Sequence, residues 1–138
     1  MPHRFIACCD GLSAAPSPIS QAVVAGTHCY ISGQLAVDAA GCFRPGTARE
    51  EAALAFRNVF AAAEAAGFGA HEIVFVDIAF IDLADLPEVN ALYAELFPEG
   101  CRPARTVYQA AALPYGGRIK VQAVAVRETS GCTCAGRP

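Results

Sequence analysis

The chain has 138 residues, of which 17% are charged and 54% are hydrophobic, and its formal net charge is −3. This length suggests one domain with a sizeable core, and the weak negative charge disfavours a large basic face for nucleic acid. No apolar run approaches the ~20 residues that a membrane-spanning helix needs. The low charge favours an oligomer that hides apolar surface. The first six residues lack the long apolar segment of a signal peptide, so we expect a cytoplasmic protein.

Short β-prone runs open the chain. The first is Phe5 to Cys9, which precedes a loop with two prolines, residues 11–20. The next two runs, residues 22–25 and 28–32, flank Gly26-Thr27 and predict a hairpin because a tight turn separates two β-prone segments.

Two helices are predicted, each with a capping signal at its start. The first follows Thr47-Ala48-Arg49-Glu50, a capping-box pattern, and ends near Gly67. The second opens at Asp85-Leu86-Pro87-Glu88, with Asp85 as the cap and Glu88 completing a second box, and ends at Pro98. The residues expected to face the core are Ala52, Phe56, Val59, Phe60 and Ala63 in the first helix and Leu86, Val89, Tyr93 and Leu96 in the second.

The remaining strands complete the predicted fold. The run Ile73 to Ile81 is apolar except for Asp77, so we expect a strand covered on both faces, by helices on one side and by something else, such as another subunit, on the other. The last stretch, Arg102 to Val126, contains two β-prone runs around a Leu-Pro-Tyr-Gly-Gly turn. This order predicts an α+β domain with two helices on one face of a mixed sheet and the other face buried between subunits. We assign residues 1–128 to this single domain and 129–138 to a C-terminal tail.

Two cations in the last stretch are the first candidates for a functional site. Arg105 begins the first of its β-prone runs, and Lys120 interrupts the second. Alternation places Lys120, Gln122 and Val124 on one face of the strand. If the two strands are neighbours, both cations could share a site. Alternatively, Arg105 could form an interface salt bridge and Lys120 could extend to solvent from a strand edge.

The seven cysteines give little support for a metal site. A cytoplasmic chain keeps them reduced. Cys132-Thr133-Cys134 is the only close pair with a spacer and could contribute to a metal site, but no second cysteine or histidine cluster completes a four-ligand zinc pattern. We therefore expect no metal and a flexible tail. We expect the remaining cysteines to be small buried residues.

Eight short motifs occur in order along residues 13–128. They are S-P-I-S-Q-A (17–22), Y-I-S-G-Q (30–34), R-N-V (57–59), A-A-G (65–67), V-N-A-L-Y (89–93), R-P-A-R (102–105), L-P (113–114) and A-V-A-V (123–126). Each motif alone is weak, but the co-linear set is specific. It resembles the RidA/YjgF family, also called the reactive intermediate deaminases or the endoribonuclease L-PSP family.

The resemblance implies a chorismate-mutase-like fold and a homotrimer with a sheet-lined core and clefts between subunits. Typical members hydrolyse 2-imino or 2-enamino acids to 2-oxo acids and ammonia without a cofactor. Arg105 stands at the position of the family arginine that holds the substrate carboxylate, a task that suits a bidentate guanidinium. Ser32, Asn90 and Tyr115 are further candidates, although Ser32 and Tyr115 could simply shape turns and Asn90 could face solvent. The charge distribution gives no support to an endoribonuclease role.

Three positions depart from the family pattern. Lys120 stands where active deaminases usually carry a glutamate that positions water, Ile19 replaces a tyrosine of the early loop, and Val107 replaces a frequent cysteine. Lys120 could act as a base, or form a Schiff base with a carbonyl substrate, only as the neutral amine. Burial and a nearby Arg105 would both favour that form. More plainly, Lys120 would be a second anion contact beside Arg105.

We therefore expect a diverged RidA-like enzyme that acts on a small carboxylate-bearing imine or enamine, or on a related reactive intermediate of a specialised pathway. The expected catalytic residues are Arg105 and Lys120, and the expected substrate contacts are Arg105, Ser32, Asn90, Ile19 and Tyr115. The alternative is a non-catalytic trimer that binds a small carboxylate or regulates another protein. Neither hypothesis involves a cofactor, a metal, nucleic acid or a membrane.

Overall fold

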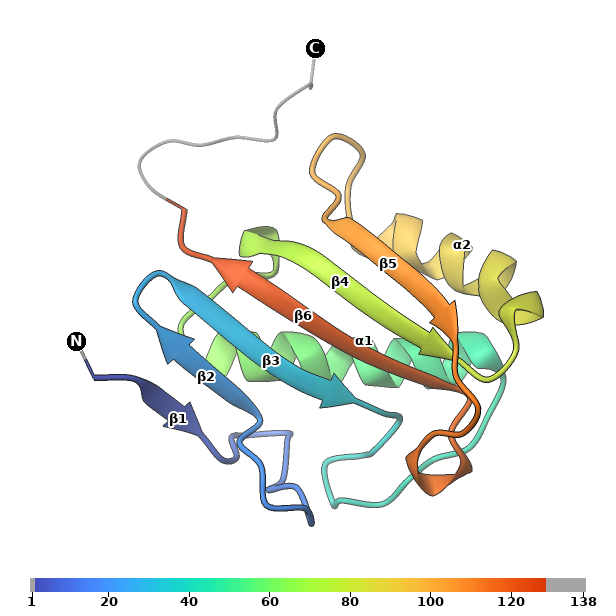
Figure 1. Ribbon diagram of the computed structural model, residues 1–138, viewed down its shortest axis with the longest axis horizontal. Coiled ribbons are helices and arrows are strands. Elements are labelled where there is room, and N and C mark those ends of the chain that lie inside the picture. Colours follow the sequence, from blue (N-terminus) through green and yellow to red (C-terminus); the bar gives the residue numbers. More distant parts are fainter. Residues whose placement is uncertain (1, 129–138) are drawn as a thin grey trace.

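The computed structural model describes residues 2–128, in which one six-stranded sheet carries two helices on one face (Figure 1). The elements are β1 (Arg4–Ile6), β2 (Ala22–Ala25), β3 (His28–Gln34), α1 (Ala48–Ala65), β4 (Ile73–Phe80), α2 (Leu86–Leu96), β5 (Ala104–Gln109) and β6 (Ile119–Val126). Short 3-10 turns lie at Ala70–Glu72, Leu83–Asp85 and Pro114–Gly116. This order confirms the predicted α+β fold class. No helix in residues 2–128 combines the length and apolar character needed to cross a membrane.

The strand order is β1-β2-β3-β6-β4-β5, so β4 lies between β6 and β5 (Figure 1). All pairs are antiparallel except β4 and β5, which are parallel because α2 carries the chain back between them. The two strands of the last stretch are therefore not neighbours. Arg105 on β5 and Lys120 on β6 are separated by the whole width of β4.

The sheet has one covered face and one open face. Val76, Ile78 and Phe80 of β4 are fully buried and face the helices, as do their partners on β6. Phe75 and Asp77 alternate onto the other face and are only partly buried. The expected cover by helices is thus present on one side, and no element in residues 2–128 covers the other.

Aromatic side chains remain exposed on the open face. Phe5 pairs with Val23, and Val23 with Tyr30, which places all three side chains on that face. Phe5 is 67% exposed and Tyr30 is 51% exposed, and Tyr108 of β5 is 45% exposed. Large aromatic groups on a sheet face are typical of a surface that packs against another protein chain.

The core lies between the helices and the covered face. Small residues of α1, including Ala52, Ala55 and Ala62, are fully buried and bring the helix close to the sheet. Phe56 packs edge-to-face against Tyr93 of α2 and against Phe97. Of the residues predicted to face the core, those that are only partly buried are Phe60, Leu86 and Leu96.

One predicted helix cap forms and the other does not. Thr47 and Glu50 make the capping box at α1: the Glu50 amide donates to Thr47 Oγ1 (3.1 Å) and the Thr47 amide to Glu50 Oε1 (2.8 Å). The box predicted at Asp85 is wrong. Asp85 has helical dihedrals (φ −78°, ψ −9°), so its side chain makes no cap bond. Glu88 instead accepts a hydrogen bond from the Arg49 amide at 3.0 Å.

A β-bulge near the end of β3 shapes the region of interest. Ile31 pairs with Ala123 and Gln34 with Val121, so β3 contains one extra residue over this interval. The bulge turns Gln34 inward, where it is 5% exposed. A Cβ at Gly33 would overlap Cε of Lys120, so the glycine leaves room for the lysine side chain in its present position. The alkyl stem of Lys120 therefore lies directly across Gly33.

Candidate functional site

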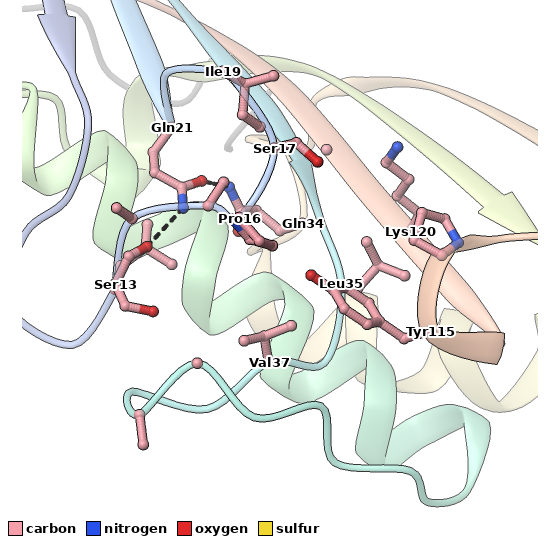
Figure 2. Close-up of a pocket in the computed structure, with 17 residues that line it drawn as sticks. Ser13, Pro16, Ser17, Ile19, Gln21, Gln34, Leu35, Val37, Tyr115 and Lys120 are labelled. Atoms are coloured by element: carbon pink, nitrogen blue, oxygen red, sulfur yellow. Dashed lines mark hydrogen bonds between the residues drawn. The ribbon is translucent and has the colours of Figure 1, made fainter.

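A cavity of about 420 Å³ opens beside the end of β3 (Figure 2). Its walls come from residues 12–19, from the chain following the bulge, from the turn at residues 114–115 and from β6. Three predicted site residues line it: Ile19, Tyr115 and Lys120. No carboxylate, imidazole or thiol is present among its lining residues, so the Lys120 amine and the Tyr115 phenol are its only ionisable groups.

Lys120 is half-buried on the open side of β6. Its register partner is Ala79, whereas its neighbours Ile119 and Val121 are fully buried toward the helices. Within residues 2–128 its ammonium makes no hydrogen bond or ion pair. Figure 2 shows Lys120 and Tyr115 on one side of the cavity and Ser13, Pro16 and Ser17 on the other. The amine is therefore available to a molecule bound in the cavity.

A chain of buried amides fixes the loop that forms this second wall. The Gln34 side-chain amide donates to Gln21 Oε1 (2.8 Å), and the Gln21 amide donates to the Ser13 carbonyl (2.8 Å). Ser32 Oγ donates to the Ser20 carbonyl at 2.6 Å. Ser32 does not itself line the cavity. Its hydroxyl holds the loop in place, and the sequence offered no signal for the role of Gln21.

The lower wall is anchored by Asn58 of α1. This side chain is fully buried, and its amide donates to the carbonyls of Leu35 (3.0 Å) and Val37 (2.8 Å). Asp38 then closes the following turn by accepting from the Cys42 amide (2.9 Å) and from Arg44 Nε (2.6 Å). The Cys42 amide and the Arg44 guanidinium hold the pKa of the Asp38 carboxyl below its usual value. Both walls are therefore preformed.

Tyr115 adopts an uncommon backbone conformation at the cavity mouth. Its φ of 63° and ψ of 8° lie in the left-handed region, which costs a non-glycine residue about 1–2 kcal/mol. Its ring stacks on Phe43 with the centroids 5.7 Å apart and an interplanar angle of 13°. Strain of this kind clusters at ligand sites. The turn thus holds an aromatic wall against the cavity.

Arg105 and Asn90 form a separate group on the helix side of the sheet. Arg105 Nη1 donates to Asn90 Oδ1 at 2.9 Å, and its guanidinium carbon lies 4.7 Å from the centroid of the Tyr93 ring. Asn90 is exposed, as the alternative expected, but its side chain also accepts this hydrogen bond. Burial raises the pKa of the Tyr93 hydroxyl, which is buried without a hydrogen-bond partner in residues 2–128. Neither Arg105 nor Asn90 lines the cavity.

The predicted site residues thus divide into two groups within one chain. Arg105 pairs with Val76, whose side chain faces the helices, and Lys120 pairs with Ala79 on the open face. The two cations lie on opposite faces of the sheet and on either side of β4. One chain alone does not bring them to a common ligand.

The other candidate sites have structural explanations. A second cavity of about 360 Å³ borders Glu51, whose buried carboxylate accepts from the Arg118 amide at 2.9 Å and thereby joins α1 to the start of β6. Residues 2–128 contain no group of three or more potential metal ligands. Cys132 and Cys134 lie outside the described residues. The expectation of buried cysteines holds for Cys29 but is wrong for Cys8 and Cys42, which lie in exposed loops. The expectation that the cysteines are reduced is wrong for Cys101, which is disulfide-bonded.

Known proteins resemble this chain in both sequence and structure. The profile of the family described as Endoribonuclease L-PSP matches residues 12–127. A protein of Bos taurus named 2-iminobutanoate/2-iminopropanoate deaminase is 42% identical over 115 residues, which cover 83% of each chain. The Homo sapiens protein of the same name is 39% identical over 114 residues, 82% of each chain.

Solved structures agree with the sequence relatives. The crystal structure of RidA from Psychrobacter has a TM-score of 0.83 and 34% identity, covering 89% of this chain and 99% of that one. The crystal structure of the YjgF gene product of E. coli has a TM-score of 0.83 and 32% identity, covering 91% and 100%. With the profile match over most of its length, this chain belongs to the RidA/YjgF family, the Endoribonuclease L-PSP family.

Proposed function

We propose that this protein is an imine deaminase that converts small carboxylate-bearing 2-imino acids, or their enamine tautomers, to 2-oxo acids and ammonia. The observation that carries this proposal is the 42% identity, over 83% of both chains, to a protein named 2-iminobutanoate/2-iminopropanoate deaminase. The cavity of about 420 Å³ is compatible because small-molecule sites typically occupy 300–1,000 Å³.

The complete site would lie between subunits of a homotrimer. The open sheet face supports assembly, since Phe5, Tyr30 and Tyr108 are exposed there and only 17% of the chain is charged. The separation of Arg105 from the cavity supports a shared site, because a neighbouring copy would have to supply the carboxylate anchor. Light scattering on the intact protein should give the mass of a trimer, and a monomer that still releases ammonia would contradict the shared site.

Each side of the shared site would have its own task. Arg105, oriented by Asn90 and supported by Tyr93, would bind the substrate carboxylate through charge-assisted hydrogen bonds. The cavity would hold the substrate side chain against Ile19 and Tyr115 and would present the Lys120 amine. Its volume and apolar lining favour an intermediate of a specialised pathway over the smallest imino acids.

Ammonia release tests the proposal directly. An amino-acid oxidase would generate imines in situ from amino acids with small, branched and aromatic side chains, and a typical family member would serve as the positive control. We expect faster ammonia release than without the protein, and loss of that acceleration in Arg105→Ala. No acceleration with any amino acid would overturn the proposal.

One observation favours a second function, that of a non-catalytic trimer that binds a small carboxylate. The cavity lining contains no carboxylate, imidazole or thiol that could activate water. Calorimetric titration with 2-oxo acids distinguishes the two functions. Binding that requires Arg105, together with no acceleration of ammonia release, would identify the binding protein.

A further inference from the structure

Lys120 is the only lysine among the 138 residues. The other side chains that carry a fixed positive charge are all arginines, so the chain uses a primary amine at one side-chain position alone. That position is the middle of a sheet and the wall of a cavity, where a solvent-facing lysine is not expected.

The structure presents this amine in a way suited to reaction. The alkyl part of the Lys120 side chain lies against the backbone of the bulge at Gly33, where no Cβ is in the way. This contact restricts the conformations of the side chain. The amine has no hydrogen-bond or ion-pair partner in residues 2–128, and no carboxylate lines the cavity. In its neutral form, a primary amine is a nucleophile toward imine and carbonyl carbon.

We propose that Lys120 is a covalent nucleophile that exchanges with the substrate imine, so that deamination passes through a Schiff base between the substrate and Lys120. This inference rests on the proposed function and deepens it, because it names the group that replaces direct attack by water. It also accounts for a cavity that lacks any conventional base.

The steps balance without an additional reactant. The neutral Lys120 Nζ attacks C2 of the protonated 2-imino acid, forming a C–N bond while the C=N electron pair moves to the substrate nitrogen. A proton passes from Nζ to that nitrogen, the original C–N bond breaks and ammonia leaves, with Lys120 now joined to C2 as a protonated imine. Water then adds to C2, and one of its protons passes to Nζ. The C2–Nζ bond breaks to release the 2-oxo acid and the neutral amine, and the second proton of the water is taken up by the departed ammonia. The net reaction consumes one water and releases ammonium.

The lining of the cavity indicates the substrate class. The lining is mixed but largely apolar: Leu12, Ile19, Leu35 and Val37 contribute hydrocarbon, and the polar side chains are those of Ser13, Ser17, Gln21 and Gln34. A substrate bound through C2 would place its side chain along these walls, whereas a charged side chain would lose solvation there. We therefore expect 2-imino acids with aliphatic or aromatic side chains, and the matching 2-oxo acids as ligands that react in reverse.

Reductive trapping tests this proposal on the full-length protein. The protein would be incubated with pyruvate or phenylpyruvate and sodium cyanoborohydride, then analysed by intact-mass and peptide mass spectrometry. We expect one adduct per chain at Lys120, formed faster as the pH rises because the neutral amine reacts. With a single lysine, the only competing primary amine is the N-terminus, which the peptide map separates.

A double variant provides a matched control. Lys120→Arg keeps the positive charge in the cavity but removes the primary amine, and Arg57→Lys on the exposed side of α1 restores the lysine count. The combined variant has the same charge and the same number of lysines as the wild type. We expect its trapping to fall at least 10-fold, whereas Arg57→Lys alone should trap at Lys120 as the wild type does.

Ammonia release separates the failure of this inference from the failure of the proposed function. If Lys120→Arg retains wild-type ammonia release, or if the double variant traps equally well at residue 57, the covalent role is overturned while deaminase activity stands. If Lys120 is trapped rapidly but the wild type does not accelerate ammonia release, the amine is reactive and the proposed function fails. Circular dichroism of each variant checks that the fold is retained.

Discussion

Arg105 and Lys120 are both cations in the C-terminal part of the chain, but the fold holds them in opposite ways. The Arg105 guanidinium is fixed by a hydrogen bond to Asn90 and by stacking over Tyr93, on the helix side of the sheet. The Lys120 amine faces a cavity on the open side and has no such partner in residues 2–128. A cation that is held rigidly is suited to recognising a fixed anion, whereas an unpartnered amine is suited to forming a new bond.

The largest expected effect is a loss of stability when Asn58, which anchors one wall of the cavity beside Lys120, is replaced. Asn58→Ala would leave the carbonyls of Leu35 and Val37 without their buried donor, and each unsatisfied group costs about 1–3 kcal/mol. We expect the free energy of unfolding, measured in urea, to fall by about 2–4 kcal/mol. Glu64→Ala, at an exposed position of the same helix, should change it by less than ~0.5 kcal/mol. Equal losses in the two variants would show that Asn58 does not anchor the wall.

Arg105→Ala should affect substrate binding. Removing a charge-assisted contact to a carboxylate costs about 1.5–3 kcal/mol, so kcat/KM should fall about 10- to 150-fold. We expect most of the change in KM, whereas Lys120→Arg should act mainly on kcat. Steady-state kinetics on the same imine would measure both parameters for each variant. A fall in kcat alone for Arg105→Ala would contradict the binding role that we assign to Arg105.

Asn90 provides a further test of the role of Arg105, because we expect it to act by orienting the Arg105 guanidinium. Loss of the 2.9 Å hydrogen bond in Asn90→Ala should raise KM about 5- to 10-fold, since a single hydrogen bond contributes about 1–1.5 kcal/mol. In the Arg105→Ala background the same change should have almost no further effect. Additive losses in this double-mutant cycle would mean that Asn90 contacts the substrate independently.

Gly33→Ala tests how Lys120 is positioned. The new methyl group would displace the Lys120 stem, which is flexible, so we expect a stability loss below about 1 kcal/mol and a clear fall in adduct formation at Lys120. In a Lys120→Ala background, Gly33→Ala should be nearly neutral for stability because nothing remains to be displaced. If Gly33→Ala still lowered the stability in the Lys120→Ala background, the new methyl group would be clashing with a group other than Lys120.

The smallest expected effect concerns Asp77 on the open face. Burial raises the pKa of its carboxyl, so the folded protein binds this proton more tightly than the unfolded chain does. Stability from this group is therefore greatest in acid and is lost as the pH rises through its folded pKa. Asp77→Asn should raise the thermal midpoint slightly at neutral pH and have no effect in acid. An Asn variant that is less stable at neutral pH would contradict this sign.

Local signals in the sequence predicted much of this fold. The order of strands and helices, the Thr47 capping box and the two faces of β6 all depend on residues close together in the chain. The insertion of β4 between β5 and β6 could not be predicted this way, because strand pairing depends on contacts between distant segments. The wrong expectation at Asp85 has a local cause instead, because Asp85 is the last residue of the 3-10 turn Leu83–Asp85 and its backbone is already helical.

The candidate site was predicted in part. Lys120, Ile19 and Tyr115 do line one cavity, and Arg105 does lie with Asn90. The separation of these groups was not predicted, since it follows from the position of β4. The roles of Ser32, Gln21 and Gln34 in holding the loop were also hidden, because a polar residue at a strand end has many local partners available to it.

The bulge in β3 makes the cavity depend on chain length as well as on side-chain identity. Ser32 and Gly33 together oppose Gln122, whereas Gln34 already stands opposite Val121. Removing residue 33 would therefore leave every inward-facing residue of β3 on its own side and simply make the strand regular. A one-residue deletion would thus remove the bulge on which the Lys120 side chain lies and would leave the same side chains of β3 facing the helices.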